Sequence, residues 1–204
     1  FHNDQSILLV ANKEDTAKVI FKRVKLAYEA LPNWLKPAVK NWGQTSLELA
    51  NGSYIGISTT TGSAARGQTI NTLLLDELAF IEPDSIVEEF MRSVLPTISR
   101  AKTSKILITS TPKGKNNIFY RMYNSATKTG TNEWNGFHAE TVDWTELPGR
   151  DEKWKLEETA KLGSIEAFNQ EYGCQFLDDG TSAIDEELFE ELKKNYKEPL
   201  HVLD

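Results

Sequence analysis

The apolar residues at the start of the chain form a short continuous run and then recur at helical spacing. The run from Ile7 to Ala11 has the length and composition of a buried strand. Asn12 follows as a candidate helix N-cap, with Asp15 three residues later. Apolar side chains then recur on one helical face before Pro32, at Ala17, Ile20, Phe21, Val24, Ala27 and Leu31. The pattern predicts a strand followed by an amphipathic helix.

The next segment alternates apolar and polar residues around a turn signal. Between Thr45 and Ser58 the alternation runs on both sides of Asn51-Gly52. This dipeptide tolerates positive φ at both central positions of a tight turn. We therefore expect a β-hairpin here.

Two further units each read as strand, turn and helix. Thr72 to Leu75 is a buried run followed by a helical pattern around residues 85–99, and Lys105 to Thr109 is followed by one around residues 117–127. Strands that alternate with helices form a parallel sheet covered on both faces. The predicted fold is α/β, with three layers, a mostly parallel sheet and a small hairpin insertion. Ligands of such sheets bind beyond the carboxyl ends of the strands.

The last third of the chain continues this alternation. We expect a strand near Phe137 to Val142, helices within residues 151–172, a strand at Gly173 to Leu177 and a charged helix at about 185–196. With 204 residues, 39% of them hydrophobic, the chain suits one domain with one sizeable core. Its apolar runs are far shorter than the roughly 18 residues of a membrane span, so we expect a soluble protein. It opens on Phe1 without a signal peptide, which we interpret as a fragment.

Charge is distributed unevenly along the chain. The net charge of −7 argues against a nucleic-acid partner, but residues 90–132 hold eight basic residues and no acidic one. A solvated face explains such a run, and an anionic partner such as phosphate or DNA also suits it. The candidates for DNA or phosphate contact are Arg100, Lys102, Lys113, Lys115 and Arg121. The three histidines and one cysteine are not grouped at zinc-ligand spacing.

Two adjacent carboxylates follow a buried strand in Leu73-Leu-Leu-Asp-Glu77. This is the Walker B pattern, in which Asp76 would hold the water shell of Mg²⁺ and Glu77 would orient or deprotonate the water that attacks the γ-phosphate. A core strand that merely ends in an acidic turn would have the same sequence. The motif alone leaves both interpretations open.

Hydroxyl and guanidinium groups near the same predicted sheet edge add to this pattern. Ser110 and Thr111 follow the next strand and could sense a γ-phosphate, although they are also ordinary turn residues. Arg66 lies in a Gly/Ser/Thr-rich loop and could act as an arginine finger, although most loop arginines are simply solvated.

No phosphate-binding loop of the Walker A type occurs in the sequence. The pair Gly114-Lys115 has Thr109 where the first glycine should be and Asn116 where a hydroxyl should follow. We therefore expect the isolated chain to bind ATP poorly and to turn it over negligibly.

Several short motifs, in order and at fitting spacing, resemble the large terminase subunit of T4-like tailed phages. They cover nearly the whole chain and are Leu31-Pro-Asn-Trp-Leu-Lys-Pro37, Leu49-Ala-Asn-Gly-Ser53, Ala65-Arg-Gly67, Leu73 to Glu77, Ser110-Thr-Pro-Lys-Gly114 and Phe168 to Phe176. The resemblance implies an incomplete RecA-like P-loop NTPase domain over residues 1–180 and a linker helix over 181–204. The family's Walker A strand would precede Phe1, and its nuclease domain would follow Asp204.

The resemblance also implies a function and partners. The family packages double-stranded DNA into procapsids with ATP and Mg²⁺, as a homo-oligomeric ring on the portal protein and together with a small terminase subunit, in the host bacterial cytoplasm. It assigns Asp76 and Glu77 to the Walker B pair, Ser110 and Thr111 to the coupling motif, and Arg66 to a finger that acts on a neighbouring subunit in some members.

Two other interpretations fit parts of the sequence. A superfamily 2 helicase also pairs Asp-Glu at a strand end with a Ser/Thr coupling motif one strand later, but it would need a second RecA-like domain. A non-enzymatic prophage remnant with a scaffold or DNA-binding role would explain the missing Walker A motif.

Overall fold

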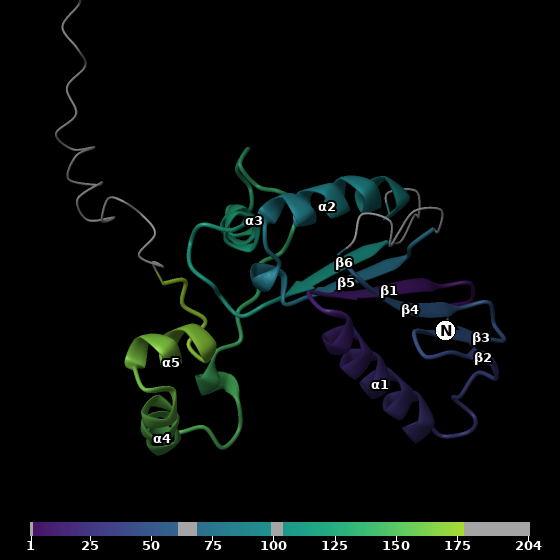
Figure 1. The fold of residues 1–204 in the computed structure, drawn as a ribbon, viewed down its shortest axis with the longest axis horizontal. Helices are drawn as coiled ribbons and strands as arrows, with labels where there is room; N and C mark the ends of the chain where they lie inside the picture. Colours follow the sequence, from purple (N-terminus) through teal and green to yellow (C-terminus); the bar gives the residue numbers. More distant parts are fainter. Residues whose placement is uncertain (1, 61–68, 99–103, 178–204) are drawn as a thin grey trace, which may run out of the picture.

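A six-stranded sheet forms the centre of the computed structural model, which describes residues 2–60, 69–98 and 104–177 (Figure 1). The strand order is β2-β3-β4-β1-β5-β6. Strands β4, β1, β5 and β6 run parallel, β3 pairs antiparallel with β4, and β2 pairs antiparallel with β3. The bounds are β1 (Ser6–Ala11), β2 (Val39–Trp42), β3 (Ser46–Leu49), β4 (Tyr54–Thr59), β5 (Thr72–Asp76) and β6 (Lys105–Thr109).

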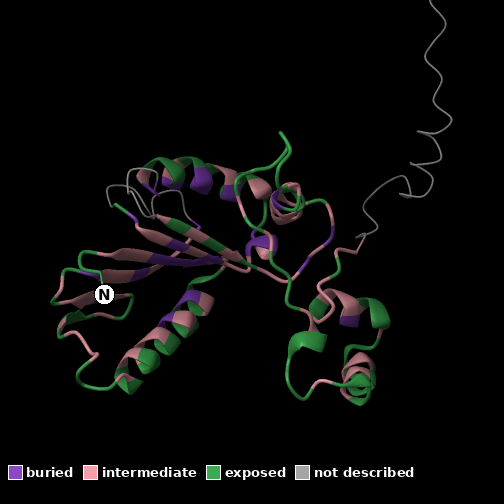
Figure 2. Cartoon of the chain, turned by 180° about the vertical axis from the view of Figure 1, so that it is seen from behind, coloured by how far each residue is buried: buried purple, intermediate pink, exposed green. Residues whose placement is uncertain are grey.

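Helices cover both faces of the sheet. Helix α1 (Glu14–Ala30) lies on one face, and α2 (Asp84–Ile98) and α3 (Ile118–Ala126) lie on the other, so that the fold has the three layers expected (Figure 1). The largest buried cluster lies between the sheet and α2, because β1, β5 and α2 all direct apolar side chains there (Figure 2). Its fully buried members include Leu73, Leu75, Val87, Phe90 and Val94.

A small helical unit beyond the sheet has an aromatic core of its own. It consists of a short 3₁₀ helix, η2 (Trp144–Glu146), and the helices α4 (Glu152–Leu162) and α5 (Ile165–Glu171). The rings of Trp144 and Trp154 stack 6.0 Å apart, and the buried ring of Phe168 lies within 6 Å of both. This unit therefore has an aromatic core that is separate from the core of the sheet.

Most of the expected elements are present. The hairpin turns at Gly52, which has a φ of 81°. Strand β6 has the expected bounds, and Asn117 caps α3 by accepting a hydrogen bond from the Tyr120 backbone. The expected helix at 185–196 lies outside the described residues. Within the described ranges, no helix is long and apolar enough to cross a membrane.

Three local predictions are wrong. Residues 137–142 and 173–177 form no strand, because neither segment has a neighbouring strand with which to form a hydrogen-bonded ladder. Lys13, not Asn12, is the N-cap of α1, and it makes no side-chain cap hydrogen bond. Strand β2 was not expected, because its residues are mostly exposed and too polar to form an apolar run.

Candidate functional site

The carboxyl ends of β5 and β6 bring Asp76 next to Thr109. The two residues are register partners in the parallel ladder. The Thr109 hydroxyl donates a hydrogen bond of 2.7 Å to Asp76 Oδ1. Because parallel strands end at one edge of a sheet, this edge is where a ligand of the fold would bind. Sequence reasoning placed Asp76 here but missed its hydroxyl partner, which aligning the two strand ends could have revealed.

Glu77 follows Asp76 in a left-handed backbone conformation, with φ of 56° and ψ of 43°. A non-glycine residue in this region is strained, and such strain often lies at functional sites. Glu77 is half-buried and precedes the 3₁₀ helix η1 (Leu78–Phe80). The turn places its carboxylate at the sheet edge beside that of Asp76.

The Glu77 carboxyl is held in a partly dry and negative environment. Burial raises its pKa above the ordinary value, and the negative charges of Asp76 and Glu171 raise it further. A hydrogen bond from the Thr111 backbone acts in the opposite direction. Glu171 lies at the end of α5 in the helical unit, and no sequence motif indicated its proximity to Glu77. A carboxylate from a distant part of the chain therefore adds to the negative environment of Glu77.

Ser110 joins the two strand ends. Its Oγ accepts a hydrogen bond of 3.1 Å from the Ala79 backbone and donates one of 2.9 Å to the Thr111 carbonyl oxygen. The Thr111 hydroxyl, in contrast, makes no hydrogen bond to any described part of the chain. Of the two hydroxyls, that of Thr111 is the one available to a ligand in this conformation.

Two of the basic candidates are engaged with acidic side chains near this edge. Lys113 pairs with Glu82 at 2.6 Å, and its ammonium lies 5.4 Å from the centre of the Phe80 ring. Arg121 on α3 pairs with Asp84 at 2.9 Å, which ties α3 to the start of α2. Lys115 lies in the turn before α3. Arg66, Arg100 and Lys102 lie outside the described residues.

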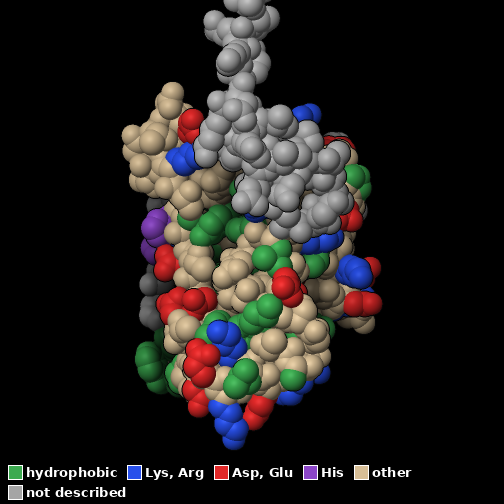
Figure 3. Space-filling model, turned by 90° about the vertical axis from the view of Figure 1, so that its left-hand side faces the viewer, with side chains coloured by type: hydrophobic (Ala, Val, Ile, Leu, Met, Phe, Trp, Pro, Cys, Tyr) green, Lys and Arg blue, Asp and Glu red, His purple; other side chains and the backbone are tan. Residues whose placement is uncertain are grey.

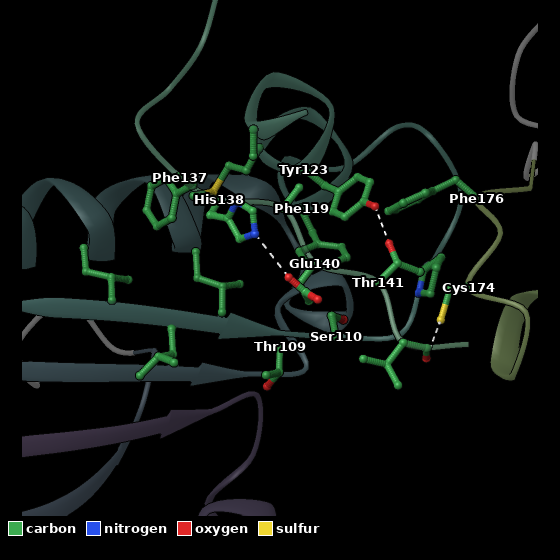
Figure 4. A pocket seen from close by; sticks show the side chains of 18 residues that line it. Thr109, Ser110, Phe119, Tyr123, Phe137, His138, Glu140, Thr141, Cys174 and Phe176 are labelled. Atoms are coloured by element: carbon green, nitrogen blue, oxygen red, sulfur yellow. Dashed lines mark hydrogen bonds and ion pairs between the residues drawn. The ribbon is translucent and has the colours of Figure 1, made fainter. Parts of the chain in front are cut away.

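An apolar groove runs along the free edge of β6 (Figure 4). Its volume is about 650 Å³, and β6, α3 and residues 137–142 form its walls. In the described part of the chain β6 pairs with β5 alone, so its other edge offers free backbone groups. Leu107 on this strand is 48% exposed. Phe176 closes one end by packing against the rings of α3, 5.0 Å from Tyr120 and 5.4 Å from Tyr123.

Comparison with known proteins identifies the family. Residues 1–191 match the family defined by the N-terminal part of terminase large subunits of the T4-like virus type. The chain belongs to this family of terminase large subunits. Its fold is that of the RecA-like ATPase domain of large terminases.

Solved structures of large terminases have the same fold. The ATPase domain from Thermus phage P74-26 is 26% identical, with a TM-score of 0.64 over 86% of this chain and 78% of that one. A mutant form of the same domain is 24% identical, with a TM-score of 0.62 over the same shares. The large terminase of bacteriophage HK97 is 14% identical, with a TM-score of 0.61 over 86% of this chain and 40% of that one.

The oxygen-rich edge of this terminase chain suits Mg²⁺. Asp76 and Glu77 offer carboxylates, and Thr111 offers a hydroxyl. No group of three or more acidic, histidine or cysteine side chains that could hold a metal occurs among the described residues. Mg²⁺ keeps several waters and binds through one or two carboxylates and the phosphates of its nucleotide, and Asp76 and Glu77 supply such carboxylates.

Proposed function

We propose that this chain is part of the ATP-hydrolysing motor that packages viral double-stranded DNA into procapsids. The observation that carries the proposal is the pair Asp76 and Glu77 at the end of β5, beside Thr109 and Ser110 at the end of β6. Family membership supports a role in phage DNA packaging. Terminase ATPase domains of the same fold support the use of ATP.

The two carboxylates have different roles in this proposal. Asp76, fixed by the Thr109 hydroxyl, would hold the water shell of Mg²⁺, which would supply positive charge opposite the phosphates. Glu77 orients the attacking water and takes its proton. Burial supports this role, because a raised pKa makes the Glu77 carboxylate a stronger base.

Ser110 and Thr111 act as the coupling motif in the proposal. Ser110, at the end of β6, accepts a hydrogen bond from the backbone of Ala79, which lies just after the Walker B pair at the end of β5. A shift of one strand end would therefore be transmitted to the other. Thr111 presents a hydroxyl to the γ-phosphate. Arg66 serves as the arginine finger toward a neighbouring subunit of a homo-oligomeric ring.

The groove beside β6 receives the strand that carries the phosphate-binding loop. A strand paired in parallel with β6 would end at the same edge as Asp76 and would deliver its loop there. The apolar walls and the free strand edge support this placement. In the proposal, the segment that fills the groove carries the Walker A sequence, which this chain does not contain, and lies upstream of Phe1.

The whole protein acts with further partners. In the proposal it docks on the portal protein, works with the small terminase subunit and carries a metal-dependent nuclease domain after a linker helix at residues 181–204. The site of action is the procapsid portal in the host bacterial cytoplasm.

The test is Mg²⁺-dependent ATP turnover by a chain extended upstream by about 60 to 100 residues, since a βα unit with a phosphate loop needs about 30 or more. Glu77→Gln should abolish turnover without unfolding the protein, whereas Glu89→Gln, on the exposed face of α2, should leave it unchanged. Turnover that does not respond to Glu77, or no turnover at all, would favour a non-enzymatic remnant.

A further inference from the structure

A second basic segment lies far from the stretch at residues 90–132. Residues 16–42 hold six basic residues and one acidic residue, Glu29, which gives a net charge of six minus one, or +5. The whole chain, by comparison, has a net charge of −7. The six basic residues are Lys18, Lys22, Arg23, Lys25, Lys36 and Lys40. Lys18 pairs with Glu14 at 2.7 Å, and the excess that remains on the other five attracts polyanions.

Cations and aromatic rings alternate along one side of this segment. The Lys25 ammonium lies 5.1 Å from the Trp42 ring, the Trp42 ring meets the Tyr28 ring at 5.5 Å, and the Lys36 ammonium lies 5.7 Å from the Tyr28 ring. Lys22 precedes Lys25 by three residues, so α1 extends the row along the same flank. We call the group of Lys22, Lys25, Lys36, Tyr28 and Trp42 the lysine–aromatic row.

The charges of the row are not neutralised within the protein. Lys25 and Lys36 donate hydrogen bonds to the backbone carbonyls of Gly43 and Glu29, and not to carboxylates. Lys22 is exposed and has no ion pair with any described residue. The ammonium groups of Lys25 and Lys36 are positioned by uncharged acceptors, and all three lysines keep their charge for a partner.

The basic stretch at 90–132 differs in this respect. Four of its described cations pair with carboxylates of the same chain: Arg92 with Glu88, Lys113 with Glu82, Arg121 with Asp84, and Lys128 with Glu133. Each pair lowers the attraction for an outside anion. The side of the molecule toward the helical unit shows acidic and basic side chains interspersed (Figure 3).

We propose that the lysine–aromatic row binds the phosphate backbone of double-stranded DNA. The identity of the polyanion rests on the proposed function. The row itself does not belong to the sheet edge that carries Asp76 and Glu77. Each lysine pairs with a phosphate, as in backbone binding without sequence preference. Trp34, 83% exposed in the loop between α1 and β2, adds an apolar contact beside the row.

The rings favour duplex over single-stranded DNA. Proteins that hold single strands offer open ring faces on which successive bases stack. Tyr28 and Trp42 instead pack edge to face against each other and carry lysine ammonium groups over their rings. Trp34 is 83% exposed and Trp42 39%, so Trp34 offers the more open ring, and the row offers mainly charges for a backbone.

The row also lies away from the nucleotide edge. Helix α1 begins just after the carboxyl end of β1 and runs toward the opposite side of the sheet (Figure 1). Its 17 residues span about 25 Å at about 1.5 Å per residue. DNA and ATP would therefore occupy separate surfaces, so that binding of the two can be measured independently.

The experiment measures binding of this chain to a fluorescent duplex over about 50 to 200 mM salt, without nucleotide. The triple variant Lys22→Gln/Lys25→Gln/Lys36→Gln should reduce the log–log salt slope by about 2.7, at about 0.9 per phosphate contact. The matched control Arg92→Gln/Lys105→Gln/Lys128→Gln removes the same charge and should leave the slope nearly unchanged. Trp34→Ala should weaken binding without changing the slope.

Each result decides the inference. The inference would be overturned if both triple variants lost the same affinity for the duplex, or if the Lys22/Lys25/Lys36 variant kept the wild-type salt slope. It would also be overturned if the chain bound single strands more tightly than duplex, or if the wild-type chain did not bind duplex. Circular dichroism of each variant checks that the fold is retained. Because no ATP is present, duplex binding through the row can succeed even where the extended chain shows no turnover, which separates a failure of this inference from a failure of the proposed function.

Discussion

The hydroxyl of Thr109 at the end of β6 donates a 2.7 Å hydrogen bond to the Asp76 carboxylate at the end of β5. The bond fixes the carboxylate that would hold the water shell of Mg²⁺. It also joins two neighbouring strands at the edge where a nucleotide would bind. Movement of either strand end would therefore shift the carboxylate that would hold the metal's water shell.

Replacing Thr109 with valine tests this link, because valine keeps the β-branched shape and removes the hydroxyl. We expect turnover by the upstream-extended chain to fall about tenfold, since a hydrogen bond to a charged group contributes about 1.5 kcal/mol. The Mg²⁺ concentration needed for half-maximal turnover should rise. The exposed Thr131→Val is the control, and equal rates for Thr109→Val and wild type would contradict the role given to this bond.

Glu171 should set the pH range in which Glu77 works. Burial, Asp76 and Glu171 all raise the pKa of Glu77, and a base acts only when it is deprotonated. Turnover should therefore fall as pH decreases through this raised pKa. Glu171→Gln removes one negative neighbour and should move the acid limb of the pH–rate profile of the extended chain to lower pH. A limb that stays in place would show that Glu171 does not influence the site.

Glu77→Gln should stabilise the chain at neutral pH. The unfolded carboxyl titrates near 4.5 and the folded one higher, so the native state binds more protons and loses stability as pH rises through this interval. Glutamine carries no such cost. The urea midpoint of Glu77→Gln should exceed that of wild type at about pH 7, and the difference should shrink toward about pH 4. For Glu89→Gln we expect no such pH-dependent difference.

Glu77→Gly should separate backbone strain from charge. The left-handed φ of 56° suits glycine, which has no Cβ to clash. The substitution should add about 1 kcal/mol of stability beyond the gain from Glu77→Gln, because left-handed non-glycine residues cost about 1 to 3 kcal/mol. Denaturant unfolding of the two variants gives the comparison. A less stable glycine variant would mean that unfolded-state entropy outweighs the relief of strain.

The exposed Leu107 side chain should promote self-association and dye binding at the free edge of β6. An apolar, unpaired strand edge is a site for self-association and dye binding. Leu107→Lys should lower the fluorescence of a hydrophobic dye and reduce light scattering of the isolated chain. The upstream extension should lower dye fluorescence by filling the groove. A wild-type chain that binds no dye and stays monomeric would contradict an open groove.

The sequence was sufficient to predict elements whose signal is local. Strands β5 and β6 are continuous apolar runs, and the polar residues directly after them had to lie at one sheet edge, which placed Asp76 and Ser110 correctly. Asn51-Gly52 likewise specified the hairpin through its own turn chemistry.

Features that depend on distant partners could not be predicted in this way. Residues 137–142 have the composition of a strand, but a strand exists only where another offers hydrogen bonds. The proximity of Glu171 to Glu77 depends on how the helical unit folds back, which leaves no mark in either local sequence. The ion pairs of Lys113 and Arg121 could not be predicted either, because their partners are 31 and 37 positions away in the sequence.

The groove also lies next to the segments that lead into and out of the helical unit. Both segments that link the helical unit to the rest of the chain, residues 137–142 and the stretch from Cys174 to Phe176, line its wall, and Cys174 Sγ lies 3.4 Å from the Val142 carbonyl oxygen where they meet. A strand inserted there would brace both links at once. The position of the helical unit would therefore depend on what fills the groove.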